Sequence, residues 1–273
     1  MGVEGANADL ACRQACPYMQ TLACPSFEDV FEAVESGKAR LGMIPIENSQ
    51  AGRVAEIHSI LPRVNVHIVG EFFQKIEHCL LGPRGATLQS VKHVYSHPQG
   101  LLQCREHIRE MQFEAHAHSN TAAAAADVAK WNDPAKAAIA SPLAGELYGL
   151  TVLKEHMQDS DDNVTVFVII AKEPVDPEGD ENTRILTTLL FSIRNIPAAL
   201  YKSLGGFATN GVNILKLESY IPGGSMREAA QFYLTFEGHP REKGVQLALE
   251  ELGFFSRKVT VLGVYPADPA RFA

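Results

Sequence analysis

Polar side chains that could bind a small carboxylated molecule follow an apolar segment early in this sequence. The run Ile44-Pro45-Ile46-Glu47-Asn48-Ser49 ends a predicted strand with a carboxylate, an amide and a hydroxyl. Ligands of open α/β sheets bind beyond the carboxyl ends of the strands. Alternatively, Asn48 or Ser49 caps the start of the next helix. The two interpretations are compatible, because a helix N-terminus with free N–H groups also binds anions.

Three further clusters place small hydrogen-bonding side chains where loops meet helices or strands. They are Tyr95-Ser96-His97-Pro98 with Gln103, Ser119-Asn120-Thr121, and Asn163-Val164-Thr165-Val166-Phe167. The second cluster begins an alanine-rich helix and has a simpler explanation as an N-cap. Each cluster alone is a weak indication. Together they predict a cleft that binds a carboxylated small molecule.

Other chemistries find less support in the sequence. His116 and His118 are two residues apart and would share one face of a strand, but no third metal ligand has a matching spacing. The glycine-rich turn Gly2-Val3-Glu4-Gly5-Ala6-Asn7 has neither GxGxxG nor the P-loop lysine. No serine lies in a GxSxG elbow. Cys104 would need an aligned histidine to act as a nucleophile.

The composition is that of an ordinary globular protein. The 273 residues suffice for about two domains of roughly 150 residues, and 46% are hydrophobic, which excludes extensive disorder. The net charge of −8, without a dense basic run, argues against nucleic acid as a partner. No apolar run reaches the roughly 18 residues of a membrane span, and no secretory signal is visible. Five irregularly spaced cysteines indicate reduced thiols in a cytoplasmic protein.

Short apolar runs alternate with amphipathic segments in the first part of the chain, which predicts parallel α/β layers. The predicted strands are 41–46, 66–72, 77–81, 91–95, 137–140 and 165–171. The predicted helices are 26–36, 100–111, 121–130 and 142–148. Ser26 should cap the first of these helices, and Gly37 should end it.

A composition change at residues 173–183, which are rich in proline and acidic side chains, predicts an exposed linker and a domain boundary. The elements predicted beyond it are strand 184–193, helix 197–209, strands 212–220 and 230–237 around Gly223-Gly224, helix 245–253 and strand 256–265. This βαββαβ order is that of the ferredoxin-like split unit.

The chain resembles the prephenate dehydratases, in their monofunctional form with a C-terminal ACT domain. The resemblance covers almost the whole chain, and its motifs occur in one order. They are Pro45-Ile46-Glu47-Asn48-Ser49, Ser96-His97-Pro98 to Gln103-Cys104, Glu146-Leu147-Tyr148-Gly149 to Thr165-Val166-Phe167, Pro197-Ala198-Ala199-Leu200, Thr209-Asn210-Gly211-Val212-Asn213 and Glu218-Ser219.

The resemblance implies an α/β catalytic domain like a type 2 periplasmic binding protein, with two lobes and the active site between them. This domain would cover residues 1–173, with lobe 1 at about 1–72 plus 152–173 and lobe 2 at about 73–151. A linker at 174–183 and a ferredoxin-like ACT regulatory domain at 184–273 would follow.

The implied activity is that of a carbon–oxygen lyase. Prephenate would lose carbon dioxide and water to give phenylpyruvate in L-phenylalanine biosynthesis, with no metal or organic cofactor. Thr165 would help the 4-hydroxyl leave, and most of the rate would come from positioning and preorganised dipoles. The implied catalytic residues are Thr165, Glu47, Asn48 and Gln103, and the implied substrate-binding residues are Ser49, Ser96, Thr121, Ala122 and Phe167. Glu47 would orient Asn48 or act as a protonated donor beside the dianion.

The implied ACT domain would bind L-phenylalanine at a dimer interface of a cytoplasmic homodimer or homotetramer, and so regulate the enzyme. The implied effector residues are Ala198, Ala199, Leu200, Asn210, Asn213, Glu218 and Ser219. The family's Gly-Ala-Leu appears here as Ala198-Ala199-Leu200, and its Glu-Ser-Arg-Pro as Glu218-Ser219-Tyr220-Ile221. A purely structural pairing of ACT domains is the alternative.

Two departures from the family pattern leave other functions open. Val166 stands where the family has an arginine, and only Met1 precedes Gly2, where we would expect the family's first strand. Arogenate is the alternative substrate. A catalytically weak phenylalanine-binding regulator and a periplasmic solute-binding protein are the alternatives to an enzyme.

Overall fold

The computed structural model describes residues 2–178, 183–194, 196–221 and 230–272. The chain forms two compact units. The first unit comprises Met1–Val30, Pro45–Arg53 and Phe73–Phe167, and the second comprises Phe31–Ile44, Val54–Phe72 and Val168–Ala273. The chain therefore enters each unit more than once. The domain limits expected from the sequence stay a prediction.

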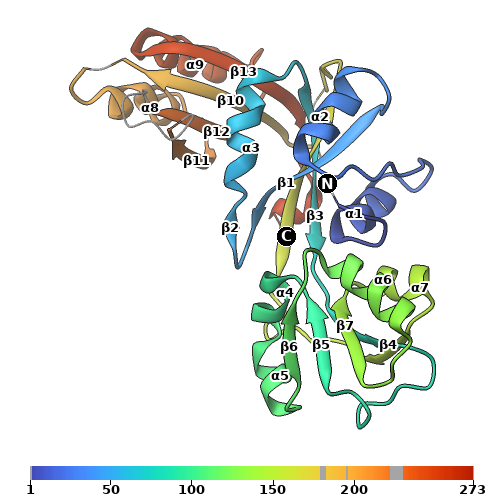
Figure 1. Ribbon diagram of the computed structural model, residues 1–273. Coiled ribbons are helices and arrows are strands. Elements are labelled where there is room, and N and C mark those ends of the chain that lie inside the picture. The colour runs from blue at the N-terminus through green and yellow to red at the C-terminus, as the bar shows by residue number, and fades with distance from the viewer. Residues whose placement is uncertain (1, 179–182, 195, 222–229, 273) are drawn as a thin grey trace. The chain divides into compact units, whose positions relative to one another are not determined.

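A five-stranded sheet organises the first unit, in the order β6-β5-β7-β4-β8 (Figure 1). Its strands are β4 (Cys79–Gly82), β5 (His93–Ser96), β6 (Glu114–Ala117), β7 (Lys136–Ala140) and β8 (Thr151–Lys154). β5 runs parallel to β6 and β7, whereas β4 is antiparallel to β7 and β8. The predicted parallel arrangement is therefore found for β5, β6 and β7, but not for β4 and β8. All four residues of β4 are buried, and a continuous apolar run of this kind does not reveal strand direction.

Successive residues of β4 point to two separate cores. Leu81 packs in one core with helices α6 (Thr121–Trp131) and α7 (Pro142–Tyr148). Leu80 packs in the other core with Ile108. The two leucines point to opposite faces of the sheet, as successive side chains of a strand do. Ala122, Ala124 and Ala125 of α6 are fully buried, so their small side chains let the helix lie close to the sheet.

The predicted helix 100–111 was wrong, because two short helices occupy this region. α4 (Pro98–Gln103) and α5 (Arg105–Glu110) are separated at Cys104, whose φ and ψ are −118° and 17°. The carboxylate of Asp159 accepts hydrogen bonds from the N–H groups of Glu106 and His107, at 3.0 and 3.4 Å. The second helix thus begins on a cap 52 residues further along the chain, which local periodicity does not reveal.

The N-terminal glycine turn contributes to packing. Gly5 has a φ of +81°, and a Cβ at this position would lie 3.0 Å from the Cα of Ala144 in α7. The hydroxyl of Ser141 donates to the carbonyl of Gly5 at 2.6 Å. Glycine is required here by both the backbone conformation and the close approach. Helix α1 (Asn7–Ala15) follows the turn.

A second sheet has the order β2-β1-β9-β3, and its longer strands contribute to both units. It contains β1 (Leu41–Asn48), β2 (Gly52–Arg53), β3 (His67–Lys75) and β9 (Val164–Ala171). The associated helices are α2 (Phe27–Glu35), α3 (Ala55–Ile60) and the 3-10 turn η1 (Leu61–Arg63). The predicted cap of α2 is confirmed, because Ser26 Oγ accepts from the N–H of Asp29 at 3.1 Å and the Asp29 carboxylate accepts from the N–H of Ser26 at 2.9 Å.

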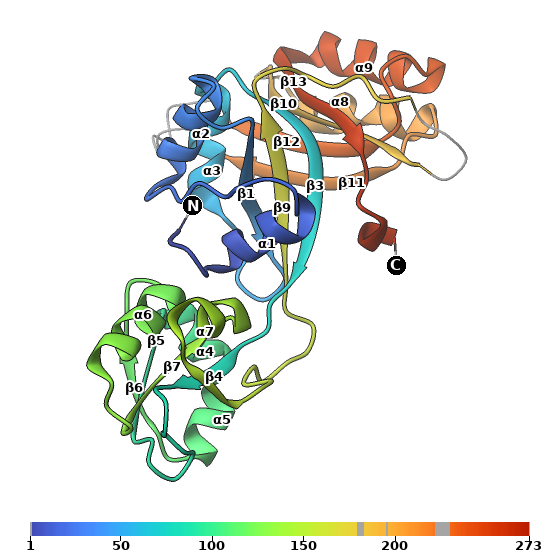
Figure 2. The ribbon, with the colours of Figure 1, turned by 90° about the vertical axis from the view of Figure 1, so that its right-hand side faces the viewer.

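The second unit contains the predicted βαββαβ arrangement (Figure 2). In chain order it consists of β10 (Ile185–Ile193), α8 (Ala199–Thr209), β11 (Ile214–Tyr220), β12 (Gln231–Glu237), α9 (Lys243–Phe255) and β13 (Ser256–Pro266). The sheet order is β11-β12-β10-β13, with every pair antiparallel. Phe191 and Phe236 of the sheet share one core with Phe207 and Leu252 of the two helices. The predicted connection through Gly223-Gly224 lies outside the described residues.

The second unit also joins this sheet to residues 54–72 through polar and close contacts. Arg271, in the 3-10 turn η3 (Pro269–Phe272), donates to the buried carboxylate of Glu71 at 2.6 and 2.7 Å. Gly263 of β13 lies against the carbonyl of Ile68, where a side chain would clash. These contacts hold the βαββαβ sheet and the first part of β3 together as one unit.

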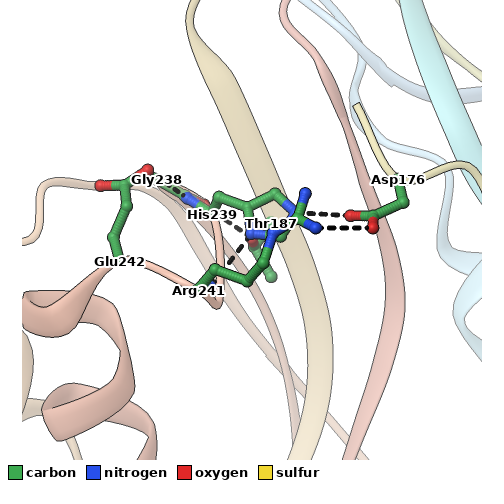
Figure 3. A network of polar contacts seen from close by, with 6 residues as sticks. All are labelled: Asp176, Thr187, Gly238, His239, Arg241 and Glu242. Atoms are coloured by element: carbon green, nitrogen blue, oxygen red, sulfur yellow. Dashed lines mark hydrogen bonds and ion pairs between the residues drawn. The ribbon is translucent and has the colours of Figure 1, made fainter. Parts of the chain in front are cut away.

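The segment after β9 is exposed, as expected of a linker, but one of its residues is held by the second unit (Figure 3). The carboxylate of Asp176 accepts from His239 Nε2 at 2.8 Å and from Arg241 Nη1 at 3.0 Å. His239 Nδ1 accepts from the N–H of Arg241 at 3.0 Å, so the ring proton is on Nε2.

All five cysteines are free thiols. Within the described ranges, no helix is both long enough and apolar enough to cross a bilayer.

Candidate active site

Asn48 connects the end of β1 to the start of β9. Its amide nitrogen donates to Asn163 Oδ1 at 2.8 Å and to Thr165 Oγ1 at 3.0 Å. Its amide oxygen accepts from the N–H groups of Gln50 and Ala51, at 3.1 and 2.9 Å. The side chain is buried and uses both ends of its amide, so its orientation is fixed.

The helix-cap interpretation of Asn48 and Ser49 was wrong. Helix α3 begins at Ala55, and its N-cap residue, Val54, makes no side-chain cap. The exposed Ser49 side chain instead donates to the carbonyl of Asp162 at 2.6 Å and accepts from the N–H of Val164 at 3.0 Å. Both side chains therefore hold the loop that leads into β9. This loop is more than 110 residues away along the chain, so the local sequence does not reveal it as their partner.

Thr165 is half-buried at the second position of β9, and its hydroxyl oxygen accepts the hydrogen bond from Asn48. Asn163, which is fully buried, accepts a hydrogen bond through Oδ1 from the same nitrogen of Asn48. The Asn163 Nδ2 atom has no hydrogen-bond partner within the described residues. A buried donor without a partner is costly, so its retention favours a polar ligand or water at this point.

Two further residues predicted on these strands are Glu47 of β1 and Phe167 of β9. Glu47 is half-buried and lies opposite Arg53 in the β1–β2 pairing. Phe167 is 2% exposed in β9, within the core. Val166 is half-buried between Thr165 and Phe167, and strand alternation directs its side chain to the face opposite theirs.

Ser96 and Thr121 come together at one edge of the five-stranded sheet. Ser96 ends β5, is fully buried and donates to the carbonyl of Ile139 at 2.6 Å. A Cβ at Gly100 would lie 2.8 Å from Ser96 Oγ and 3.4 Å from Thr121 Cγ2, so Gly100 separates the two side chains. The start of α4 therefore approaches the start of α6 closely.

Asn120 is the N-cap of α6. Its side chain accepts from the N–H groups of Ala122 and Ala123, at 2.9 and 3.4 Å, which confirms the simpler interpretation of this cluster. Ala122 is fully buried in the core. Its methyl group therefore does not reach the surface.

Gln103 forms a pair with His78, a residue that the sequence did not single out. Gln103 Oε1 lies 2.9 Å from His78 Nε2, so that nitrogen carries the proton. Burial lowers the pKa of His78, and the hydrogen bond to Gln103 only partly opposes this shift, so the ring is neutral. The backbone carbonyl of Gln103 accepts from the N–H of Asp159 at 2.7 Å. An isolated polar residue before an apolar strand was the only sequence indication of His78.

Three of the predicted effector residues lie at the start of α8. Ala198 is exposed and has a φ of +58°, in the left-handed region that glycine adopts more easily. Ala199 is 3% exposed, and Leu200 packs on the core of the βαββαβ fold.

The other four effector residues lie at the end of α8 and in the segment and strand that follow. Asn210 donates from Nδ2 to the carbonyl of Gly206 at 2.8 Å, and Asn213 donates to Glu237 at 3.4 Å. Ser219 is exposed on β11. Glu218 contacts Lys216 Nζ at 2.8 Å and His58 Nε2 at 2.9 Å. Burial raises the Glu218 pKa, but the contacts with His58 and Lys216 outweigh it and lower the value to about 2.

The two histidines considered as metal ligands do not act together. His118 lies beyond the end of β6, and its Nε2 is 3.2 Å from the carboxylate of Asp127. His116 is on β6 and faces His93 of the neighbouring strand.

These features define an α/β protein with a hydrogen-bonded asparagine–threonine pair at the ends of two strands and an appended βαββαβ fold. The family model described as prephenate dehydratase matches residues 1–175. The chain belongs to this family, which makes it a hydro-lyase, and the α/β fold expected from the sequence is confirmed.

Relatives and solved structures support this membership. The chain is 46% identical to a bifunctional N-acyl-homoserine lactone acylase/prephenate dehydratase of Komagataeibacter europaeus, over 99% of this chain and 95% of that protein. It is 36% identical to arogenate dehydratase/prephenate dehydratase 2, chloroplastic, of Arabidopsis thaliana, over 98% of this chain and 72% of that protein. The crystal structure of an Arthrobacter aurescens prephenate dehydratase in complex with L-Phe has a TM-score of 0.88 and 28% identity, covering 99% of this chain and 89% of that one.

Proposed function

We propose that this protein converts prephenate to phenylpyruvate in L-phenylalanine biosynthesis. The observation that carries this proposal is the hydrogen bond from Asn48 to Thr165. Because the Thr165 oxygen accepts this bond, its own O–H is directed elsewhere and can donate to a leaving hydroxyl. Asn163 supplies a further buried donor beside the same amide.

The reaction needs positioned donors more than a strong acid. The bond between the ring and its carboxylate breaks, its electron pair enters the ring, and the C4–O bond breaks as hydroxide leaves. Together with one proton, the dianion gives phenylpyruvate, carbon dioxide and water. Thr165 stabilises the departing oxygen, whereas Gln103 is oriented by neutral His78 and presents its amide N–H groups to a carboxylate. Asn48, Ser49, Ser96 and Thr121 serve in orientation and binding.

A turnover assay tests this proposal. Purified protein is given prephenate, and phenylpyruvate is measured, with Thr165→Ala as the inactive comparison. We expect turnover in the wild type and its loss in the variant. Absence of turnover in a folded wild type that still binds L-phenylalanine would instead support the weak regulatory protein.

Arogenate is the alternative substrate, supported by the match to the plant relative. It carries an amino group where prephenate has a keto group, so the same dehydration would give phenylalanine. The two substrates are compared by kcat/KM in the same preparation. A higher value for arogenate would reassign the substrate and leave the reaction class unchanged.

Regulation by L-phenylalanine through residues 184–273 forms part of the proposal. It is supported by the βαββαβ fold, the similarity to a relative crystallised with L-Phe, and the exposure of Ala198, Asn213 and Ser219. We further propose a cytoplasmic homodimer or homotetramer. Titration calorimetry with L-phenylalanine, inhibition assays and sedimentation test these points. Inhibition that survives Ser219→Trp would place the effector elsewhere.

A second candidate activity is hydrolysis of N-acyl-homoserine lactones. The 46% identity to the bifunctional Komagataeibacter europaeus protein, over nearly the whole of both chains, supports it. Chromatographic detection of released homoserine lactone tests it. The Thr165→Ala variant then shows whether both reactions use the same residues, because a shared site would lose both activities.

A further inference from the structure

Three side chains that commonly bind metals meet on β5 and β6, two strands that lie side by side in Figure 1. His93 is the first residue of β5 and lies opposite Glu114 in the parallel pairing. His116 is two residues beyond Glu114 on β6, so the two share one face of the sheet. The pairing register thus brings together a group that no spacing along the chain would suggest.

The donor atoms of this group lie close enough together to bind one ion, because one ligand atom of each residue lies within 4.8 Å of the other two. His93 Nδ1 lies 3.1 Å from His116 Nε2 and 3.2 Å from Glu114 Oε2, and His116 Nε2 lies 3.6 Å from Glu114 Oε1. Ligands at roughly 2.0–2.1 Å from a tetrahedral ion are about 3.3–3.4 Å apart. We propose that His93, Glu114 and His116 form a binding site for a divalent transition-metal ion of the zinc type.

The ligand set fits this class of ion. Two imidazole nitrogens with one carboxylate oxygen are a ligand set that suits Zn²⁺, whereas Ca²⁺ and Mg²⁺ require mostly oxygen. The side chains of His93 and His116 are 34% and 33% exposed, and that of Glu114 is 66% exposed. The site is therefore open to solvent, which provides an entry path and leaves the fourth position for water.

Aromatic neighbours hold one of the ligands in place. The His116 ring stacks on Tyr95 at a centroid distance of 4.7 Å and an interplanar angle of 17°. Tyr95 in turn contacts Trp131 edge-on at 4.8 Å. A ligand ring oriented before the ion arrives loses less freedom on binding. Trp131 is the only tryptophan of the chain and therefore reports on this site.

The strand next to β5 on its other side, β7, places the positive charge of Lys136 near the proposed metal site. Lys136 of β7 lies opposite His93 on its other side. Its ammonium lies 3.4 Å from the carboxylate of Asp133 and 5.1 Å from the ring centre of Trp131. Lys136 is therefore held by these two groups.

The metal site is distinct from the proposed substrate site. His93 and Ser96 are at opposite ends of β5, about 10 Å apart at roughly 3.3 Å per residue. β6 is an edge strand of the sheet, so an ion bound here would join it to β5. The ion would stabilise the first unit and take no part in the dehydration.

Metal binding to chelator-treated, metal-free protein tests the proposal. Titration calorimetry with ZnCl₂ should give one ion per chain. His93→Gln and His116→Gln should each weaken binding by more than the roughly 10- to 100-fold that follows loss of an outer-shell partner. Co²⁺ should quench the fluorescence of Trp131 in the wild type and not in His116→Gln. Thermal unfolding should shift upward with Zn²⁺ in the wild type and not in His93→Gln or His116→Gln.

His118→Gln is the matched control, because His118 is a nearby histidine that contacts Asp127 instead. It should bind Zn²⁺ as the wild type does. Circular dichroism confirms that each variant is folded. The proposal is overturned if the wild type shows no saturable binding. It is equally overturned if His116→Gln binds as tightly as the wild type, or if Cys12→Ser abolishes binding that both histidine variants retain.

Discussion

The amide nitrogen of Asn48 lies 3.0 Å from the hydroxyl oxygen of Thr165, 117 residues further along the chain. The same amide donates to Asn163 and, through its oxygen, accepts from the turn that follows β1. One side chain thereby fixes the loop after β1, the entry to β9 and the orientation of the threonine hydroxyl. In the proposed mechanism this geometry makes the weakly acidic Thr165 an effective donor.

Removing the hydroxyl of Thr165 should therefore abolish most of the activity. We expect Thr165→Ala to lower kcat by roughly 10²- to 10³-fold, the usual effect of losing one preorganised donor. Thr165→Ser should recover much of this loss because it keeps the hydroxyl. Thr151→Ala, an exposed threonine of β8, is the control and should leave kcat unchanged. Turnover is measured by a steady-state assay of phenylpyruvate. A near-normal kcat for Thr165→Ala would contradict the proposed role.

The contacts around Thr165 were only partly predictable from the sequence. Polar side chains at the end of one apolar strand and the start of another predicted that Asn48 and Thr165 take part in one site, and the structure joins them by a hydrogen bond. The direct bonding of Ser49 to Asp162 and Val164 could not be predicted, because it depends on which strands pair. The strands and helices themselves follow from apolar periodicity and capping, as in α2 and α7.

Features that depend on contacts between distant segments could not be predicted from the sequence. Asp159 caps α5 from 52 residues away, so a single helix was predicted where the chain forms two. His78 was missed because its only distinguishing feature is its bond to Gln103. The spacing along the chain suggested His118 as the partner of His116. The pairing of β5 with β6 instead brings His93 into contact with His116.

The departure at Val166 should matter little to catalysis. Its side chain points away from the face that carries the Thr165 hydroxyl. We expect Val166→Arg to change kcat/KM for prephenate by less than about threefold, whereas a paired guanidinium–carboxylate contact of roughly 1.5–3 kcal/mol would raise it more than tenfold. Val152→Arg, which adds the same charge at an exposed position of β8, is the control. A tenfold gain confined to Val166→Arg would show that position 166 reaches the substrate.

The buried ion pair between Glu71 and Arg271 should be costly to break from one side. The Glu71 side chain is 0% exposed and receives two hydrogen bonds from Arg271. Arg271→Met leaves the buried Glu71 carboxylate without its counter-ion and, within the described residues, with only the N–H of Asp268 as a donor, so we expect a loss of about 3–5 kcal/mol in the free energy of urea unfolding. Adding Glu71→Gln should restore part of the loss. Arg257→Met, at an exposed position of β13, should have little effect. Equal effects of the two arginine variants would contradict the argument.

Ala198→Gly should stabilise the βαββαβ fold, because Ala198 has a φ of +58°. The left-handed conformation costs a side-chain-bearing residue roughly 1–2 kcal/mol, and the greater freedom of glycine in the unfolded chain offsets part of the gain. We expect a net increase of about 0.5–1 kcal/mol in the unfolding free energy. Ala208→Gly, exposed in α8, should lower stability by about 1 kcal/mol. If both variants lose stability, the left-handed conformation at position 198 is not a source of strain.

The pair formed by Glu218 and His58 should make stability depend on pH at the acid end. The Glu218 pKa is lowered from 4.5 to about 2, since the contacts with His58 and Lys216 outweigh burial, which would raise it. A carboxyl group with a lowered folded-state pKa binds protons more tightly in the unfolded chain. Its stabilising contribution is therefore complete above about pH 4.5 and is lost as the pH falls through about 2.

Urea unfolding of the wild type and of Glu218→Gln, repeated from pH 7 to pH 2, measures this contribution as a difference. The difference should be largest and constant at neutral pH, where the ionised Glu218 is paired, and should shrink steadily below about pH 4.5. Glu250→Gln removes an exposed carboxylate from α9 and should show no comparable pH-dependent difference. A difference between the wild type and Glu218→Gln that stays constant down to pH 2 would contradict this prediction. It would mean that the contacts with His58 and Lys216 do not stabilise the ionised form of Glu218.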